Sequence, residues 1–582
     1  MQEAQSAGTR IVGDAMTKTS STRSGAPAAA ADSHRDPADW YANRPWTAHY
    51  PDFMRADIDL DPDATALSLL RAACARYADR VAFEFDGTRL TYREWQCQAD
   101  ALARFLVHEW KLAAGDRVLF LLPNLPAFPV ALLAAWSAGL VVVPMLTATT
   151  AHEFEDPIAD AAPQAIVGID VLMKHFRAAR GAGAVRELVV ATPPALFGRA
   201  DAPPADAVGF DAAIAAGATL PPLERAVGPG DLALLQYTGG TTGVSKAVIT
   251  TQRNMLAEVE MLRMAVTEYA RPEPDLVVSV HPFFHSAGMA VNLLQYSSNG
   301  ATHLLFPKSK APEPVVEGWR GRGVTAILAG PAFYNALLGT PGFADLDFST
   351  LRAGFVGGMP LRPDIRERWE RITGAPMIEG YGLTELAGPL TAQMGSDRRD
   401  GSVGFPLPSI ELTIRDADDP GHRAVPPGEQ GEIWLRGPCL MPGYYGRPDE
   451  TARAMTAEGW FRTGDVGRMD PQGYLYLLGR IKDIIIVASV NVYPSEIEDV
   501  VGALPGVADV CAVGMPDPDH GERVRLFVAR RSPQLDAATV AAWCAERLSD
   551  YKRPKRIEFV ESLPRSPAGK VLRRELGSRP LT

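Results

Sequence analysis

Residues 234–248 read LLQYTGGTTGVSKAV, and this stretch decides the fold of the chain. A buried apolar strand, Leu232 to Gln236, is predicted to break here into a loop that holds glycines, hydroxyl side chains and a lysine. Glycines let backbone N–H groups turn toward phosphate oxygens, hydroxyls donate to others, and a lysine neutralises charge. The stretch therefore predicts a polyphosphate-binding loop. Its residues are Thr238, Gly239, Gly240, Thr241, Thr242, Gly243 and Lys246.

This loop differs from a Walker A loop, which needs a Gly, four residues and then Gly-Lys-Ser/Thr. Here Ser245 precedes Lys246 and Ala247 follows it. A flexible surface loop is the other interpretation of such a Gly/Thr-rich composition. The strand before the loop and the lysine at its end favour phosphate binding.

Length and composition restrict the class of protein. The chain has 582 residues, 46% of them hydrophobic, which exceeds what one core usually supports, so at least two domains are expected. A net charge of -11 argues against a nucleic-acid partner and against attraction to anionic lipid. The five cysteines are scattered without metal-ligand spacing and are expected to be reduced thiols of a cytoplasmic protein.

Two segments need separate treatment before the fold is assigned. Residues 1–36 are rich in Ser, Ala, Gly and Thr and are expected to be disordered, because they cannot offset their ordering entropy by burial. The uncharged run 127–146 has Pro129 suited to the first turn of a helix and Gly139 suited to its end. The resulting helix is too short to cross a bilayer, so no transmembrane segment is predicted.

From Ala66 onward, helical patterns alternate with short apolar runs, which predicts a large α/β fold with parallel strands. The dipeptide Asp86-Gly87 predicts a hairpin turn. After residue 481 the pattern changes to a small α+β domain, in which Ser495 and Glu498 are expected to form a capping box. The strands expected in the first half are Val81–Phe85, Leu90–Tyr92, Val118–Leu122, Ala165–Gly168 and Leu188–Ala191.

The phosphate loop resembles the core motif of the adenylate-forming superfamily, which contains acyl-CoA synthetases, peptide-synthetase adenylation domains and luciferases. Further stretches match the same superfamily in the same order from about Trp40, among them 379–385 (EGYGLTE), 460–465 (WFRTGD) and 563–572 (LPRSPAGKVL). Residues 40–51 resemble the corresponding segment of long-chain fatty acyl-CoA synthetases. The resemblance implies a large adenylate-forming domain, 37–481, and a mobile C-terminal domain, 482–582.

The resemblance also implies roles for single residues. Lys570 would be the catalytic lysine, Lys482 the hinge, and Thr384 and Glu385 would act at the α-phosphate and at Mg²⁺, with Thr242 as a further metal ligand. A lone histidine is more often a satisfied core residue, and a glycine pair can serve a turn with no ligand. The motifs nevertheless place His285 and Gly330 at the acyl substrate. The nucleotide would be bound by the phosphate loop together with Gly357, Gly358, Met359, Tyr381, Gly382, Asp465 and Arg480.

The implied activity is ATP-dependent conversion of a carboxylic acid, of medium or long aliphatic chain, to an acyl-adenylate and then to a CoA thioester. ATP, Mg²⁺ and CoA are the expected cofactors. Two alternatives stay open: an acyl-AMP ligase that loads a carrier protein, and a catalytically idle nucleotide-binding homologue. The first is raised by Ala488-Ser489, which stands where the family has a glycine-containing pair before 491–494 (NVYP). The sequence also leaves open a homodimer and a peripheral membrane contact.

Overall fold

The structure of the chain is a computed structural model. The predicted disordered segment 1–36 lies outside the described residues except for Asp36, as do Gly239 to Gly243 of the phosphate loop and the pair Ala488-Ser489. The described residues are 36–147, 149–180, 185–192, 194–198, 205–238, 245–266, 274–307, 311–359, 361–394, 398–487, 490–517, 520–566 and 569–580.

One seven-stranded sheet is parallel except at its last strand, β2. The Asp86-Gly87 turn joins β1 to β2 with φ of 48° and 76°, the positive values that a type I′ turn needs, so the predicted hairpin is confirmed. The second strand ends at Thr91 and not at Tyr92, because the Thr91 hydroxyl caps the helix α3 (Tyr92–His108). The strand order is β14 (Met377–Glu379), β13 (Ala353–Val356), β12 (Ala326–Ala329), β10 (Leu276–Ser279), β11 (Thr302–Leu305), β1 (Val81–Phe85) and β2 (Thr88–Thr91).

The second seven-stranded sheet is parallel except at β9, which returns antiparallel to β8. The apolar runs expected near residues 118, 165 and 188 are its strands β3, β5 and β6. Parallel strands buried on both faces need such continuous apolar runs, which is why the sequence identified them. The order is β7 (Val208–Gly209), β6 (Arg186–Val190), β5 (Ala165–Ile169), β3 (Arg117–Leu121), β4 (Val141–Pro144), β8 (Leu232–Thr238) and β9 (Lys246–Thr251).

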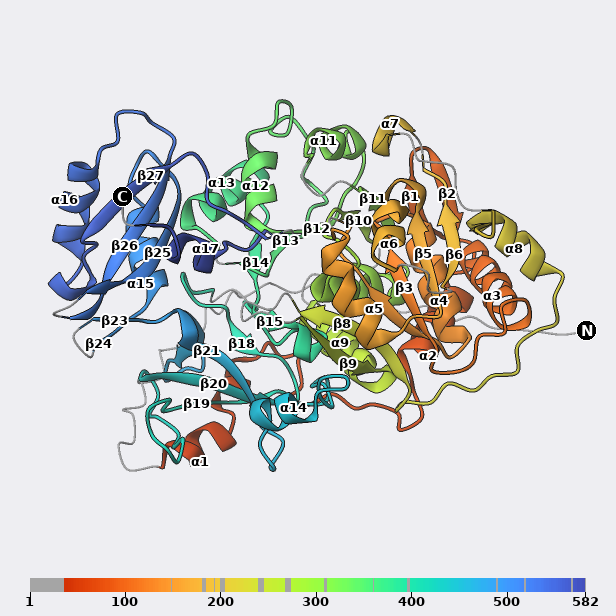
Figure 1. Cartoon of the computed structure of the whole chain (residues 1–582), viewed down its shortest axis with the longest axis horizontal. Helices are drawn as coiled ribbons and strands as arrows, with labels where there is room; N and C mark the ends of the chain where they lie inside the picture. The colour runs from red at the N-terminus through yellow and green to blue at the C-terminus, as the bar shows by residue number, and fades with distance from the viewer. Residues whose placement is uncertain are drawn as a thin grey trace, which may run out of the picture. The chain divides into compact units, whose positions relative to one another are not determined.

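Helices cover these sheets and close a common core. The helix α4 (Ala127–Ser137) is buried along its whole length and belongs to a core cluster that also contains side chains of both sheets. In Figure 1, α3 lies beside α8 (Phe210–Ala218), and the two pack so closely that a Cβ at Gly217 would meet the Ala101 carbonyl oxygen. Of the helices that the structure describes, none combines the length and apolar character required to traverse a membrane.

An antiparallel four-stranded sheet follows in the chain. It consists of β19 (Glu411–Arg415), β20 (Gln430–Arg436), β21 (Phe461–Met469) and β22 (Leu475–Arg480). The helical turn η7 (Ile481–Asp483) leads from β22 into a last, five-stranded sheet. That sheet is formed by β23 (Ile485–Val487), β24 (Val490–Val492), β25 (Val507–Asp517), β26 (Gly521–Arg530) and β27 (Arg556–Val560).

The C-terminal sheet packs its own helices and has a separate cluster of buried side chains around Val487, Leu526 and Val540. Its helices are α15 (Pro494–Gly502), α16 (Ala537–Arg547) and α17 (Arg573–Gly577). The α+β pattern expected after residue 481 is therefore present, whereas the domain boundary itself stays a prediction. The mixed α/β fold with parallel sheets is confirmed.

One local prediction is wrong. The helix α15 begins at Pro494 with Tyr493 as its N-cap, and no side chain caps it, so the expected Ser495/Glu498 capping box does not form. Proline fixes φ near the helical value and lacks the N–H that would need a partner, so the helix starts two residues earlier than the capping box predicted. The Ser495 hydroxyl donates instead to the Leu478 carbonyl, and Glu498 binds Arg573.

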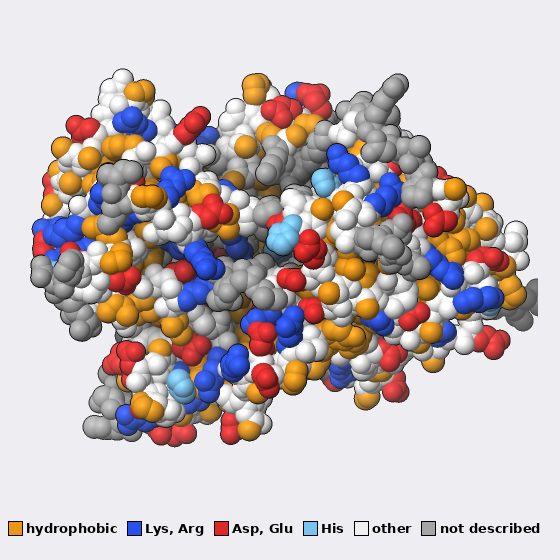
Figure 2. Space-filling model, in the orientation of Figure 1, with side chains coloured by type: hydrophobic (Ala, Val, Ile, Leu, Met, Phe, Trp, Pro, Cys, Tyr) orange, Lys and Arg blue, Asp and Glu red, His pale blue; other side chains and the backbone are white. Residues whose placement is uncertain are grey.

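Basic and acidic side chains are mixed over the face shown in Figure 2, with no single-sign field. This distribution gives no support to a nucleic-acid surface, which would need a continuous basic patch.

Candidate active site

The candidate residues gather at the carboxyl ends of neighbouring parallel strands. Gly330 follows β12, the segment 357–359 follows β13, and the segment 380–385 follows β14. His281 and His285 follow β10, which is next to β12. Because ligands of open α/β sheets bind outside the carboxyl ends of the strands, the topology brings these motifs to one edge.

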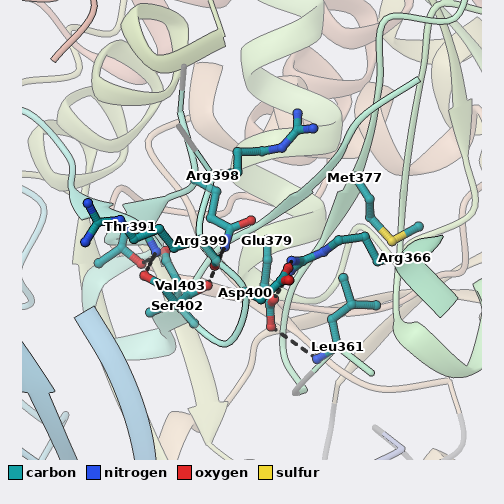
Figure 3. Close-up of polar contacts among 12 residues, drawn as sticks. Leu361, Arg366, Met377, Glu379, Thr391, Arg398, Arg399, Asp400, Ser402 and Val403 are labelled. Carbon is teal, nitrogen blue, oxygen red and sulfur yellow. Dashed lines mark hydrogen bonds and ion pairs between the residues drawn. The ribbon is translucent and has the colours of Figure 1, made fainter. Parts of the chain in front are cut away.

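Glu379 joins two of these segments (Figure 3). Its carboxylate accepts a hydrogen bond from the Leu361 backbone N–H at 3.1 Å and one from Arg366 at 3.0 Å. Burial raises the pKa of Glu379 to about 7, and the neighbouring Arg366 opposes that shift. Since Glu379 is the last residue of β14, these contacts tie the segment after β13 to the start of the 380–385 segment.

Arg366 forms ion pairs with one buried and one exposed carboxylate. The side chain of Glu379 is 9% exposed and that of Asp400 is 87% exposed, so the two pairs should contribute differently to stability. Replacing Arg366 by methionine leaves Glu379 buried without its cation, so unfolding at pH 8 should become easier by roughly 3 kcal/mol. The loss should shrink toward pH 5, because the folded pKa of Glu379 lies above its unfolded value and protonation relieves the cost at low pH. Denaturant titration at both pH values measures this change.

Asp400→Asn is the matched control, because it removes the other ion pair of the same arginine at the surface. An exposed pair contributes little, so this variant should keep the denaturation midpoint of the wild type. Equal losses in Arg366→Met and Asp400→Asn would contradict the role given to the buried pair.

The predicted glycines differ in what the backbone requires of them. Gly358 has φ of 82°, a conformation that favours glycine, and a Cβ there would meet no atom within 4 Å. Gly357 and Gly330 also face space, since the nearest atom to a Cβ is 3.7 Å away at Gly357 and beyond 4 Å at Gly330. At Gly382 a Cβ would lie 2.3 Å from the Gly388 carbonyl oxygen, so close approach of two backbone segments already explains this glycine.

Tyr381, Asp465 and Arg480 form one hydrogen-bonded unit. Asp465 and Arg480 face each other across β21 and β22, and Arg480 Nε lies 2.8 Å from Asp465 Oδ1. The Tyr381 hydroxyl donates to the other oxygen, Oδ2, at 2.5 Å. Burial raises the pKa of Asp465 and that of Tyr381. The structure thus brings together three residues predicted to bind the nucleotide.

Lys570, which lies in the C-terminal part of the chain, interacts electrostatically with Asp465 and Arg480 of this unit. Burial lowers its pKa, and nearby Arg480 lowers it further, whereas Asp465 and Glu385 raise it. A tight turn holds the lysine: Gly569 N–H donates to the Ser566 carbonyl at 2.8 Å, and Ser566 N–H to the Lys570 carbonyl at 2.7 Å. Lys570 thus interacts with the charges of Asp465 and Glu385, and its catalytic role stays a prediction.

The turn of Lys570 also lies against the segment after β13, since a Cβ at Gly569 would be 3.9 Å from Met359 Sδ. Arg565 donates to the Gly569 carbonyl at 2.7 Å and pairs with Asp509. These contacts fix the lysine without using its ammonium group, which stays available for a ligand.

The stem of the phosphate loop is formed by the paired residues Thr238 and Lys246 at the ends of β8 and β9. The Ser245 hydroxyl donates to the Thr238 carbonyl at 2.7 Å and helps to close the stem. Lys246 forms an ion pair with Glu450. The other loop residues, Gly239, Gly240, Thr241, Thr242 and Gly243, fall outside the described part of the chain.

His281 and His285 lie next to each other, with 3.4 Å between His281 Nε2 and His285 Nδ1. Burial lowers the pKa of His285 to about 4, with Lys570 adding to the shift, and burial lowers that of His281 to about 3. Both imidazoles are therefore neutral at pH 7. Asn124 holds their loop by donating to the His281 carbonyl and accepting from Phe283 N–H.

This neutrality predicts the pH behaviour of the site. Since the folded pKa of His285 lies below the working range, the rate of acyl-adenylate formation, the reaction that the resemblance implies, should show no histidine ionisation between pH 6 and 8. His285→Gln, which loses one polar contact, should lower kcat/KM for the acid by up to about tenfold and keep the shape of the profile. Pyrophosphate release measured against pH tests this; a limb near pH 6.5 that disappears in the variant would contradict it.

Thr384 and Glu385 lie in a short helical turn, η6 (Thr384–Leu386). The Glu385 carboxylate accepts a hydrogen bond from the Tyr444 hydroxyl at 2.9 Å, and its backbone carbonyl accepts one from Met441 N–H at 2.8 Å. Among the described residues no group of three or more His, Cys, Asp or Glu side chains could hold a metal ion by itself. A single carboxylate nevertheless fits Mg²⁺, which usually takes one or two carboxylates together with substrate phosphates and water.

Sequence reasoning missed four residues that organise the site: Asn124, Arg366, Tyr444 and Glu450. Asn124 could have been found, because it is a polar residue directly after the apolar run of β3. The other three come from elements distant in sequence from the groups that they contact. For Tyr444 and Glu450, no pattern within 441–451 indicates which side chains they approach.

The motifs that resemble the adenylate-forming superfamily lie together at the carboxyl ends of the parallel strands, as that resemblance implies for an enzyme that binds a nucleotide there. Two family models agree with this assignment: AMP-binding enzyme matches residues 70–445, and AMP-binding enzyme C-terminal domain matches 496–570. The chain therefore belongs to the AMP-binding enzyme family, and the resemblance drawn from its motifs is confirmed.

Curated relatives extend over nearly the whole chain. A long-chain-fatty-acid–CoA ligase of Escherichia coli O157:H7 is 37% identical over 552 residues, which cover 91% of this chain and 97% of the relative. The protein of that name from Bacillus subtilis is 32% identical, with 92% and 98% covered. A feruloyl-CoA synthase of an Amycolatopsis species is 33% identical, with 86% and 95% covered.

Solved structures give the same fold. ATP-bound MatB from Rhodopseudomonas palustris superposes with a TM-score of 0.76 at 30% identity, over 88% of this chain and 98% of that one. The anthranilate CoA ligase AuaEII in complex with anthranoyl-AMP gives 0.79 at 24% identity, with 89% and 97% covered. At 24% identity the second likeness supports the fold alone.

Proposed function

We propose that the protein is an AMP-forming fatty-acid–CoA ligase. The observation that carries this proposal is the match with long-chain-fatty-acid–CoA ligases over 91% of the chain at 37% identity. The interaction of Lys570 with the charges of Asp465, Arg480 and Glu385 supports it, because an idle homologue would have no need to keep a cation there.

In the first half-reaction, a carboxylate oxygen of the fatty acid attacks the α-phosphorus of ATP. The new bond joins this oxygen to phosphorus, the bond to the bridging oxygen breaks, and pyrophosphate leaves. Lys570 holds carboxylate and phosphate together and stabilises the charge that develops between them. The ring of Tyr381 stacks on the adenine, and the Asp465 carboxylate accepts hydrogen bonds from the ribose hydroxyls. Arg480 lies on the phosphate side of the nucleotide.

The phosphate loop, with Lys246 at its stem, takes the leaving pyrophosphate. Glu385 and Thr242 would hold a magnesium ion, which neutralises phosphate charge when bound. Thr384 contributes a hydroxyl at the α-phosphate. The protein itself performs little covalent chemistry, so positioning and charge neutralisation determine the rate.

In the second half-reaction, the CoA sulfur attacks the acyl carbonyl carbon, the bond to the phosphate oxygen breaks, and AMP leaves. The thiol proton is lost to the departing AMP or to solvent. The C-terminal domain turns about Lys482 between the two steps, so that Lys570 withdraws and the thiol enters.

The test is a panel of acids offered with ATP and CoA, read by pyrophosphate release and by mass spectrometry of the products. Saturated acids of medium and long chain should give acyl-CoA and AMP. The feruloyl-CoA synthase among the relatives makes ferulate the informative competitor. If ferulate is preferred, ferulate replaces the fatty acid as the proposed substrate. If thioester forms only on a carrier protein, the carrier protein replaces CoA as the proposed acceptor. If none of the acids causes pyrophosphate release, the proposal is rejected.

A further inference from the structure

One segment, residues 441–451, contacts two charged groups that the proposed function places around the phosphates. Met441 N–H and the Tyr444 hydroxyl both donate to Glu385, to its backbone carbonyl at 2.8 Å and to its Oε1 at 2.9 Å. Glu450 pairs with Lys246, whose Nζ lies 5.1 Å from the centre of the Tyr444 ring. Tyr444 therefore touches Glu385 with its hydroxyl and Lys246 with its ring.

The backbone fixes Tyr444 on both sides. Ile249 N–H donates to the Gly443 carbonyl at 3.1 Å, and Tyr445 N–H donates to the Ala247 carbonyl at 2.8 Å, so the segment adds to the edge of β9. Tyr444 N–H donates to the Thr451 hydroxyl at 3.0 Å. The Tyr444 hydroxyl is the donor in its contact with Glu385, because an ionised carboxylate can only accept a hydrogen bond.

The hydrogen bond restricts the carboxylate in a way that suits cation binding. Glutamate has three rotatable side-chain torsions, and fixing one oxygen removes most of that freedom before any ligand arrives. Within the described part of the chain, the other oxygen, Oε2, has no hydrogen bond or ion pair. Carboxylates that ligate metals are commonly held by such hydrogen-bonding partners, and losing the partner lowers the affinity for the metal.

We propose that Tyr444 is a positioning residue for Glu385, which it orients for the divalent cation that accompanies ATP. The ring completes the arrangement, because the ammonium of Lys246 above it is attracted to the aromatic face and keeps the tyrosine in place. This inference rests on the proposed function, since it assumes that ATP binds at the loop beside Lys246.

The test compares ATP affinity with and without Mg²⁺ by calorimetry in the absence of any acid, so that no turnover occurs. Tyr444→Phe removes the hydroxyl and keeps the ring under Lys246. Affinity for metal-free ATP should stay within about twofold, while the gain in affinity caused by Mg²⁺ should fall by roughly 10-fold to 100-fold. In pyrophosphate release, the Mg²⁺ concentration at half-maximal rate should rise, and kcat at saturating Mg²⁺ should recover.

The matched control is Tyr445→Phe, which removes a neighbouring hydroxyl and should leave both affinities unchanged. In a Glu385→Gln background, Tyr444→Phe should have no further effect, because the two residues act as a unit. An unchanged Mg²⁺ gain in Tyr444→Phe would overturn the inference, and so would a lowered Tm with both affinities weakened, which indicates a structural role. A wild-type protein that binds no ATP in either condition would instead refute the proposed function.

Discussion

Replacing Lys570 by alanine is expected to slow acyl-adenylate formation by about 100-fold or more. Lys570 is an exposed residue whose charge interacts with those of Asp465 and Glu385, where charge is proposed to develop as the carboxylate meets the α-phosphate. Removing a preorganised donor from such a place costs the transition state more than the ground state. Pyrophosphate release in single-turnover experiments measures this step.

The second half-reaction distinguishes this role from a general defect. Lys570→Ala supplied with synthetic acyl-adenylate and CoA should form thioester at close to the wild-type rate, because the lysine is absent from that step in the proposed mechanism. If thioester formation falls by the same factor as adenylation, Lys570 does not act selectively on the first step.

The thermal stability of Lys570→Ala distinguishes loss of a catalytic group from loss of the folded structure. Lys570 is an exposed residue, and its pKa is lowered, so the folded protein does not favour the charged form and replacement by alanine should not lower Tm. Lys555→Ala is the matched control, because Lys555 belongs to the same C-terminal part and its side chain is 40% exposed near Asp550. This variant should keep both half-reactions intact.

Much of the fold could be predicted because its signals are local. The strands β3 and β5 are short apolar runs between turn residues, and Asp86-Gly87 specifies a turn by its own φ preferences. The same local reasoning failed at Ser495 and Glu498, where two local preferences compete. Pro494 started the helix first, and distant partners, Leu478 and Arg573, took the two side chains.

The residues of the candidate site also divide into those that local motifs predict and those that only the assembled fold brings together. Asp465 and Arg480 come from motifs that a sequence displays, and strand pairing then sets them opposite each other. The contact between Tyr444 and Glu385 joins residues 59 positions apart through the edge of β9, so no spacing rule predicts it. Residues that bind a ligand can therefore be recognised from motifs, whereas residues that orient them depend on the assembled fold.

The Glu379–Arg366 pair shows why such supporting residues matter for mechanism. Arg366 comes from α13 (Pro363–Thr373), and Glu379 ends the neighbouring β14. Their contact fixes the carboxyl edge of two strands, which carry Met359 and Tyr381, two residues proposed to bind the nucleotide. Rigid elements thus hold the proposed purine site, while Lys570 arrives on the part of the chain that is proposed to move.

Lys482→Pro is expected to stop thioester formation while acyl-adenylate still accumulates. Lys482 is the second residue of η7, directly after β22, and the proposed domain rotation needs its φ to change. Proline fixes φ near -65° and is tolerated in the first turn of a helix, so the conformation seen here should persist. Lys570 then stays at the site, adenylation proceeds, and CoA cannot enter.

The measurement is a rapid-quench time course with fatty acid, ATP and CoA, in which acyl-adenylate and acyl-CoA are quantified separately. Lys482→Pro should accumulate acyl-adenylate close to the enzyme concentration, with acyl-CoA formation slower by about 100-fold or more. Lys482→Ala is the control, because it deletes the side chain and keeps the backbone free to rotate, so it should still complete the reaction. A proline variant that makes acyl-CoA at the rate of the alanine variant would place the pivot elsewhere, and one that forms no acyl-adenylate would show that proline distorts the adenylation site itself.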